Sequence, residues 1–328
     1  MDRGDGPRLL GPAPLDRSPV LDLRAPRSDL RLRAATGMQP EAALAPPRVP
    51  PRLLERAEAI DLEWVKSLDA SLHAYAELAI GQAERGRQPG RETTRMDILH
   101  MPLLVEMENA RRPGLHLHAF ASVQLCIAAL RDHAEAARQE GAAPTSMRCV
   151  VQAGKNVMHH FALDVRFTPD APPSFIHYEP AASRAPGQVI SETLAEAFPG
   201  ARVALVHNPV QFSQWDCAMF SLDHVLQSFK TRERYADPIH AGAASPDDLA
   251  LPVEFFKHMH SKQQMEHRPD ADAIVTKVRT GAAAETLRQR VLDYRATRGE
   301  GAYSTSIEGF RLQQIRRAAE YLATRPPR

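Results

Sequence analysis

Apolar residues are spaced differently at the two ends of the chain and in its centre. Between residues 55 and 85 they recur every three to four positions, as they do in VEFFKHMHSKQQ, ADAIVTKV, AAETLRQRVLDYRA and SIEGFRLQQIRRAAEYLA. This spacing gathers apolar side chains on one face of a helix. Segment 96–112 also has a helical pattern, with an interruption expected at Pro102, because proline lacks the amide that a helix interior uses. We therefore predict helical segments on both sides of the centre.

The centre instead contains short runs rich in β-branched residues, which are typical of strands. These runs are GLHLHAF, MRCVVQA (147–153), HFALDVRF (160–167), SFIHYEP (174–180) and ARVALVH (201–207). Turn signals such as AGKN and TPDAPP separate them. Helices are predicted at 122–140, where Gly141 ends the pattern, at 188–198 and at 216–230. The pattern therefore predicts an α+β (α/β) fold with a central sheet.

Four regions follow from this pattern: 1–53, a helical segment 54–110, a β-containing core 111–245 and a second helical segment 246–328. The first region contains ten of the 27 prolines and many Arg and Ala residues. Such a segment buries too little apolar surface to offset its ordering entropy, so we expect it to be disordered. It is either a plain tail or linker, or an export and targeting segment.

Composition narrows the class of protein further. The net charge of +1 gives no indication of a nucleic-acid binder. The three cysteines, Cys126, Cys149 and Cys217, match no metal or disulfide framework, so we expect no metal site and a reducing compartment. No apolar run approaches the ~18 residues of a membrane span. The N-terminal sequence MDRGDGPRLL lacks the apolar stretch of a Sec signal peptide.

Cys217 is the most informative single residue. It lies in QFSQWDCAMFSL at the predicted start of a helix, and Asp216 is in place to cap that helix. The helix dipole and the free amides of the first turn would stabilise a thiolate and face an oxyanion. The competing interpretation is a buried structural cysteine, which is the usual fate of a free Cys.

A nucleophilic cysteine needs a base, and the base needs a group that orients it. His159 and His160 stand at the head of one predicted strand, and Glu179 ends the next. Neither histidine is favoured by its local sequence, and a histidine or glutamate at a strand end is often merely solvated. Gln211, six positions before Cys217, could donate its amide to an oxyanion, or could be an ordinary loop residue.

One set of residues resembles the YopJ family of bacterial effectors, whose fold is related to the Ulp-like cysteine peptidases. The family pattern has a histidine, a carboxylate 19 positions later, and a glutamine six positions before a cysteine. The matching residues are His160-Phe161, Glu179-Pro180-Ala181, Gln211, Ser213, Asp216-Cys217 and Phe220-Ser221-Leu222. The spacing selects His160 over His159. The resemblance covers roughly residues 90–320.

The resemblance implies an activity. Family members enter host cells by type III secretion and act in the host cytoplasm. They transfer acetyl from acetyl-CoA to Ser, Thr or Lys of host signalling or immune proteins through an acetyl-cysteine. Regions 54–110 and 246–328 would then be regulatory segments that flank the catalytic core and bind inositol hexakisphosphate as activator.

A polyanion requires converging basic groups. The candidates are Arg91, Arg95, Lys257, His258, Arg311, Arg316 and Arg317. Lys257 also matches the family's autoacetylated position, in the sequence FFKH. Two alternatives remain open. A cysteine protease acting on ubiquitin-like conjugates would use the same triad, and Ala218, where the peptidases have glycine, would suit an inactive binding module.

Overall fold

The computed structural model describes residues 48–138, 143–154, 157–276, 283–298 and 301–325. All of them belong to one compact unit, Glu41–Arg328. The predicted disordered segment 1–53 lies outside the described residues, except for residues 48–53. Residues 51–53 form the start of the first helix, α1 (Pro51–Glu58), so helical structure begins slightly before the expected position.

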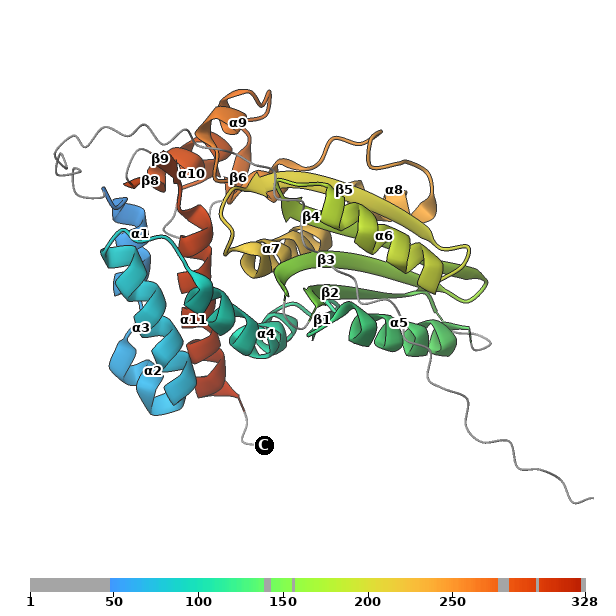
Figure 1. The fold of residues 1–328 in the computed structure, drawn as a ribbon, viewed down its shortest axis with the longest axis horizontal. Coiled ribbons are helices and arrows are strands. Elements are labelled where there is room, and N and C mark those ends of the chain that lie inside the picture. The colour runs from blue at the N-terminus through green and yellow to red at the C-terminus, as the bar shows by residue number, and fades with distance from the viewer. Residues whose placement is uncertain (1–47, 139–142, 155–156, 277–282, 299–300, 326–328) are drawn as a thin grey trace, which may run out of the picture. The chain divides into compact units, whose positions relative to one another are not determined.

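A five-stranded sheet forms the centre, in the order β1-β2-β3-β4-β5 (Figure 1). Its strands are β1 (Leu117–Phe120), β2 (Thr145–Gly154), β3 (Val157–Thr168), β4 (Ala171–Ala181) and β5 (Arg202–Gln211). The three central strands pair antiparallel, whereas β1 and β5 pair parallel to β2 and β4. All the predicted strands are present, and the predicted fold class is confirmed.

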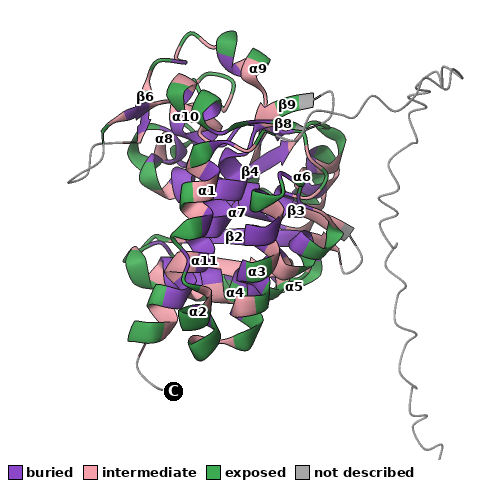
Figure 2. Ribbon diagram, turned by 90° about the vertical axis from the view of Figure 1, so that its left-hand side faces the viewer, coloured by how far each residue is buried: buried purple, intermediate pink, exposed green. Residues whose placement is uncertain are grey.

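Different helices cover the two faces of the sheet. On one face, α5 (Val123–Ala137) and α6 (Ala185–Ala197) pack on Phe161, Leu163 and Phe175. On the other face, α7 (Cys217–Lys230) packs on Ala162 and other alternate positions of the same strands. Figure 2 shows α7 and the strands beside it as largely buried. The nucleophile candidate therefore begins a helix that the core holds on every side.

Helices from both ends of the described chain form one cluster beside the sheet (Figure 1). Long α11 (Ser306–Thr324) contacts α1, α3 and α4 as well as α7. This cluster consists of α1, α2 (Leu62–Leu68), α3 (Ala70–Glu84), α4 (Arg91–Arg111) and α11. The segments predicted to flank the core thus lie together, although they are far apart in sequence.

Between α7 and α11, the described part of the chain forms only short elements. Its helical pieces are η1 (Arg232–Arg234), α8 (Ala236–Ala241), η2 (Val253–Phe256), α9 (Lys262–Glu266) and α10 (Leu287–Asp293). Two small sheets pair β6 (Ile274–Thr276) with β7 (Glu285–Thr286), and β8 (Arg295–Arg298) with β9 (Gly301–Ser304).

Three local predictions are wrong. Helix α4 continues through Pro102, because the buried Met101 and Leu104 fix it against the core although proline removes one backbone bond. The ADAIVTKV segment contains strand β6 instead of a helix, since pairing with β7 satisfies its backbone. AAETLRQRVLDYRA forms a helix only over α10, with strand pairing at both ends. Helix α5 ends at Ala137, and Gly141 lies outside the described residues.

Candidate active site

Strand β5 delivers the chain directly to the nucleophile candidate. β5 ends at Gln211, five residues form a connection, and α7 begins at Cys217. The Gln211 amide donates to Cys217 Sγ at 3.1 Å and to the Ser213 carbonyl at 2.7 Å. Gln211 therefore lies beside the thiol, as its predicted role requires. Cys217 is 7% exposed, so its sulfur lies at the surface of the core.

His159 connects Cys217 to a carboxylate. Its Nε2 lies 2.8 Å from Glu179 Oε2, and the Cys217 thiol lies close enough to its ring to raise its pKa. Burial disfavours the imidazolium, but the interactions with Cys217 and Glu179 outweigh burial and raise the pKa of His159 to about 10. Burial also opposes ionisation of Glu179, yet His159 lowers the pKa of that carboxyl overall. The three side chains are therefore connected, an arrangement that could serve as nucleophile, base and orienter.

The prediction that His160 faces Glu179 is wrong. Ala162 pairs with Tyr178 across β3 and β4, so Phe161 lies opposite Glu179. Because side chains alternate along a strand, residue 159 shares the face of Glu179 and residue 160 points to the opposite face. His160 Nδ1 lies 3.1 Å from the Met158 carbonyl, and burial lowers the pKa of this histidine to about 4. The histidine that pairs with Glu179 therefore lies 20 positions before it, not 19.

Neighbouring groups fix the Glu179 carboxylate. Its second oxygen accepts the Ala181 amide at 2.9 Å. Helix α6 passes close above it: a Cβ on Gly187 would lie 3.1 Å from Glu179 Cγ. His177, on the same face, is hydrogen-bonded to Ser191 of α6 at 2.9 Å. Sequence reasoning missed these supporting residues, because their contacts join separate segments of the chain.

Asp216 occupies the position before α7, as predicted, but its side chain makes no capping bond. The carboxylate instead accepts hydrogen bonds from Ser213 and Arg311. Because the side chain is bonded elsewhere, the first-turn amides of α7 are not occupied by the expected cap.

The predicted polyanion ligands do not all come together. Arg311 is 2% exposed and bonds two carboxylates, so its charge is already compensated within the core. Arg91 and Arg95 are exposed on α4, where Arg95 pairs with Glu92 at 3.2 Å. His258 is buried and bonds Ser306 at 2.7 Å, and burial, followed by nearby Arg290, holds its pKa well below the usual range. Arg317 approaches Glu108 at 3.8 Å.

A more basic surface lies between α1, α10 and α11. A cavity of about 210 Å³ there is lined by Arg52, Glu55, Arg56, Ala59, Tyr294, Leu312, Gln313 and Arg316. Arg316 is a predicted ligand, whereas Arg52 and Arg56 were missed because they fall at the edge of the proline-rich segment. We call this the basic cavity.

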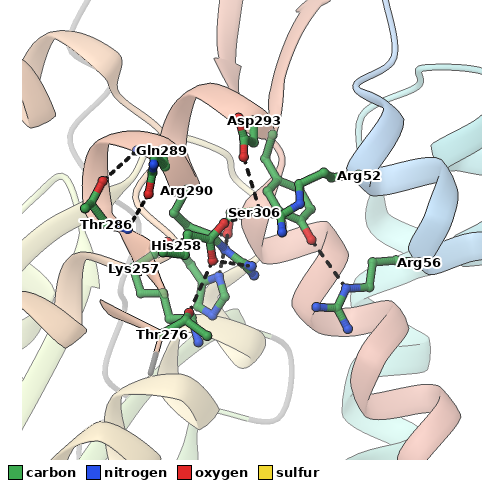
Figure 3. A network of polar contacts seen from close by, with 12 residues as sticks. Arg52, Arg56, Lys257, His258, Thr276, Thr286, Gln289, Arg290, Asp293 and Ser306 are labelled. Carbon is green, nitrogen blue, oxygen red and sulfur yellow. Dashed lines mark hydrogen bonds and ion pairs between the residues drawn. The ribbon is translucent and has the colours of Figure 1, made fainter. Parts of the chain in front are cut away.

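Figure 3 shows Lys257, His258 and Arg290 on one side of a polar network that has Arg52 and Arg56 of α1 on its other side. Burial, followed by repulsion from Arg290, lowers the pKa of Lys257 to about 8. Arg290 donates to Ser306 at 2.8 Å and to Glu285 at 3.2 Å. The basic cavity and these two cations bring positive charge from four separate segments of the chain, a pattern that could hold a polyanion.

Among the described residues, no group of His, Cys, Asp or Glu side chains is arranged to hold a metal ion. In the same part of the chain, no helix has the length and apolarity that crossing a membrane demands.

Comparisons with known proteins agree with this geometry. The family model described as YopJ Serine/Threonine acetyltransferase matches residues 72–317. The serine/threonine-protein acetyltransferase HopZ1a of Pseudomonas syringae pv. syringae is 27% identical over 318 residues, covering 77% of this chain and 82% of HopZ1a.

Solved structures show the same fold. The structure of HopZ1a in complex with IP6 and CoA has a TM-score of 0.69 at 24% identity, and the match covers 83% of this chain and 99% of that one. A structure described as AvrA delL154 with IP6 and CoA has a TM-score of 0.61 at 23% identity, covering 77% of this chain and 98% of that one.

Proposed function

The chain belongs to the YopJ family of serine/threonine acetyltransferases and has the Ulp-like core of that family, and from this premise we propose that it transfers acetyl from acetyl-CoA to host proteins through an acetyl-Cys217 intermediate. One observation carries the proposal. His159 is hydrogen-bonded to Glu179 and interacts with the thiol of Cys217, which begins helix α7. The acceptor groups are serine or threonine hydroxyls, with lysine as a further acceptor.

The first step loads the enzyme. The raised pKa of His159 favours an imidazolium at neutral pH, which stabilises a Cys217 thiolate. The thiolate attacks the thioester carbonyl, and the resulting oxyanion is held by the Gln211 amide and first-turn amides of α7. The carbon–sulfur bond to CoA then breaks, His159 protonates the departing CoA thiolate, and the acetyl group remains on Cys217.

In the second step, the acetyl group passes from Cys217 to the acceptor. His159, now neutral and oriented by Glu179, removes the proton of an incoming hydroxyl as the oxygen attacks acetyl-Cys217. Collapse of the tetrahedral intermediate breaks the bond to Cys217, so that the thiolate and imidazolium re-form. A single base serves both steps, and the covalent acetyl-Cys217 intermediate, formed as CoA departs, gives ping-pong kinetics.

Inositol hexakisphosphate is the proposed activator, and the basic cavity is its proposed site. Three guanidinium groups but only one carboxylate line this cavity. The solved structures of HopZ1a and AvrA contain IP6 and CoA, which supports the same ligands here. Regions 54–110 and 246–328 are accordingly proposed to regulate the core at 111–245.

Delivery by type III secretion, action in the host cytoplasm and host immune or signalling proteins as substrates are proposed from family membership. Autoacetylation at Lys257 is proposed too, because its pKa of about 8 leaves more neutral, nucleophilic amine at physiological pH than an ordinary lysine has.

The test is autoacetylation of the full chain with radiolabelled acetyl-CoA, with and without inositol hexakisphosphate. The parent should become labelled, much more so with the polyanion, and Cys217→Ala should remain unlabelled. Cys149→Ala is the matched control, because that thiol is fully buried away from the triad and its loss should leave labelling in place.

Two outcomes would contradict the proposal. Equal labelling of the parent and Cys217→Ala would remove Cys217 from the chemistry. Cleavage of a ubiquitin-like fusion by the parent, without acetyl transfer in the presence of polyanion, would assign the same triad to a protease.

A further inference from the structure

A buried ionic cluster connects α11 to the segment that precedes the nucleophile. Arg311 Nε and Nη2 donate to the two oxygens of Asp97, at 2.8 and 2.9 Å, and Nη2 also donates to Asp216 at 2.6 Å. The three side chains are at most 2% exposed. The guanidinium therefore bridges α4 and the residue next to Cys217.

The pKa values of the two carboxyls in this cluster are shifted in opposite directions. Burial favours the neutral form of both carboxyls. For Asp216, Arg311 outweighs burial, with help from nearby His260 and from the Ser213 hydroxyl, so its pKa is lowered. For Asp97, burial wins over Arg311 and the pKa is raised, while Tyr75 donates a hydrogen bond to the same carboxyl.

The Asp216 carboxylate is directed away from α7. An aspartate before a helix ordinarily accepts an amide of the first turn. Here the side chain makes no such bond, and Ser213 and Arg311 take it instead. The first α-helical backbone bond of α7 runs from the Phe220 amide to the Asp216 carbonyl, so the amides of residues 217–219 precede the helical ladder.

Other contacts hold the same connection. Thr94 of α4 donates to the Trp215 carbonyl at 2.9 Å, and the Phe212 amide donates to His260 at 3.0 Å. These bonds fix the path of the backbone. They leave open where the Asp216 side chain goes, which the Ser213 hydroxyl and the guanidinium of Arg311 determine.

We propose that Arg311 is a positioning residue for the nucleophile: it holds the Asp216 carboxylate away from the first turn of α7, so that the amides there face the thiolate and oxyanion. Without this bridge, Asp216 would cap the helix and place a carboxylate against the group that must become negative. The chemical meaning of this inference rests on the proposed acetyl transfer, but the reactivity of Cys217 can be measured without it.

The test measures the rate of Cys217 alkylation by iodoacetamide against pH in the full chain, with the modified peptide identified by mass spectrometry. The groups that face Cys217, His159 and Gln211, are unchanged in every variant. Arg311→Lys keeps one positive charge but cannot bridge two carboxylates. It should raise the pH of half-maximal alkylation by about one unit and slow acetyl transfer roughly tenfold or more.

Rescue separates positioning from simple structural support. Adding Asp216→Ala to Arg311→Lys removes the displaced carboxylate, so the pH midpoint should return to that of the parent. If Arg311→Lys does not fold, Asp216→Ala alone still tests the inference: its midpoint should not rise, and a rise would overturn the proposal.

The matched control is the exposed pair of Arg288 and Asp272, whose bonds measure 2.7 and 3.1 Å. Arg288→Lys should change neither quantity. A lower melting temperature in Arg311→Lys with an unmoved pH midpoint, or failure of the rescue, would make Arg311 merely structural. A shifted and rescued midpoint in a protein that transfers no acetyl would uphold the positioning role and reject the proposed function.

Discussion

Two regions of the molecule are rich in ionisable groups but balance charge differently. One is the sheet edge formed by the start of β3 and the end of β4, where Cys217 begins α7, and the other is the basic cavity beside α11. At the sheet edge, His159 meets a fully buried Glu179 at 2.8 Å, and each potential charge has a partner. In the basic cavity, Arg52 pairs with Glu285 and Asp293 and Arg316 pairs with Glu320, but both arginines remain about 40% exposed. Three guanidinium groups and one carboxylate line the cavity itself. The first region is organised before any ligand arrives, whereas the second has charge that a polyanion would complete.

This contrast has a general physical basis. Fixed hydrogen bonds at a reacting group avoid reorganisation during the reaction, so a catalytic site benefits from complete internal pairing. A regulatory site benefits from unbalanced charge, because the binding free energy comes from neutralising it. We therefore expect substitutions in the two regions to change different quantities.

The largest expected effect distinguishes two adjacent histidines at the sheet edge. His159→Gln should lower the acetyl-transfer rate by about 10³-fold or more, because it removes the base from a triad that acts as a unit. His160→Gln should keep the rate within about tenfold of the parent, since its side chain lies on the other face of β3. Rates are measured at saturating polyanion, and melting temperatures report folding.

The reverse ranking, with the His160 variant inactive and the His159 variant active, would show that the paired geometry at the sheet edge is not the working one. An equal loss of acetyl-transfer rate in both variants would show only that this end of β3 must be intact.

A smaller effect is expected in the basic cavity. Arg56→Gln with Arg316→Gln should weaken binding of inositol hexakisphosphate on the order of 10²-fold, because two charge-assisted contacts are lost. The measurement is titration calorimetry at constant ionic strength. Arg288→Gln, in an exposed pair elsewhere, is the control and should bind normally. Unchanged affinity in the double variant would place the polyanion elsewhere.

In the same variant, alkylation of Cys217 in the absence of polyanion should match the parent. A change there would mean that the basic cavity supports the nucleophile even when empty, and the two regions would no longer be separable.

The smallest effect is a pH dependence at Lys257. Its pKa of about 8 lies below the ordinary value, so the free protein carries a neutral amine above pH 8. A bound polyanion favours the ammonium, and binding should therefore take up a proton and weaken several-fold as pH rises from 8 to 9. Calorimetry in buffers of different ionisation enthalpy measures this uptake.

Lys257→Arg is the sharp control, because an arginine stays charged throughout this range and should flatten the added pH dependence. The lowered pKa of Lys257 also makes the stability of the folded protein depend on pH. An unfolded lysine has an ordinary pKa of 10.5, so between about pH 8 and pH 10.5 the unfolded chain binds more protons at Lys257 than the folded protein does. The contribution of Lys257 to stability therefore rises with pH across that window. An identical pH slope for binding to parent and variant would exclude Lys257 from the polyanion site.

Local patterns predicted the catalytic centre well. The strands and α7 were predicted because alternation and turn residues are local properties. Cys217, Glu179 and Gln211 were selected as site residues, and the structure brings all three together. Motif spacing chose His160 over His159, but the strand register places His159 beside Glu179.

Predictions failed where distant contacts override local preference. Pro102 does not break α4, because packing on the core holds the helix. Arg311 was expected to bind a polyanion, but two carboxylates from other segments enclose it. Arg52 and Arg56 were not among the predicted polyanion ligands, because their local sequence does not show that α1 packs against α11.

The sequence by itself determined the class of the fold, the helix that begins with Cys217 and the family to which the chain belongs, because these depend on periodicity and on short motifs. The tertiary structure decided which histidine meets Glu179, which arginines remain available to an anion and where the Asp216 carboxylate is held. The physical reason is that a strand register and a buried ion pair are set by residues up to 214 positions apart, and one residue of register reverses the face of a side chain.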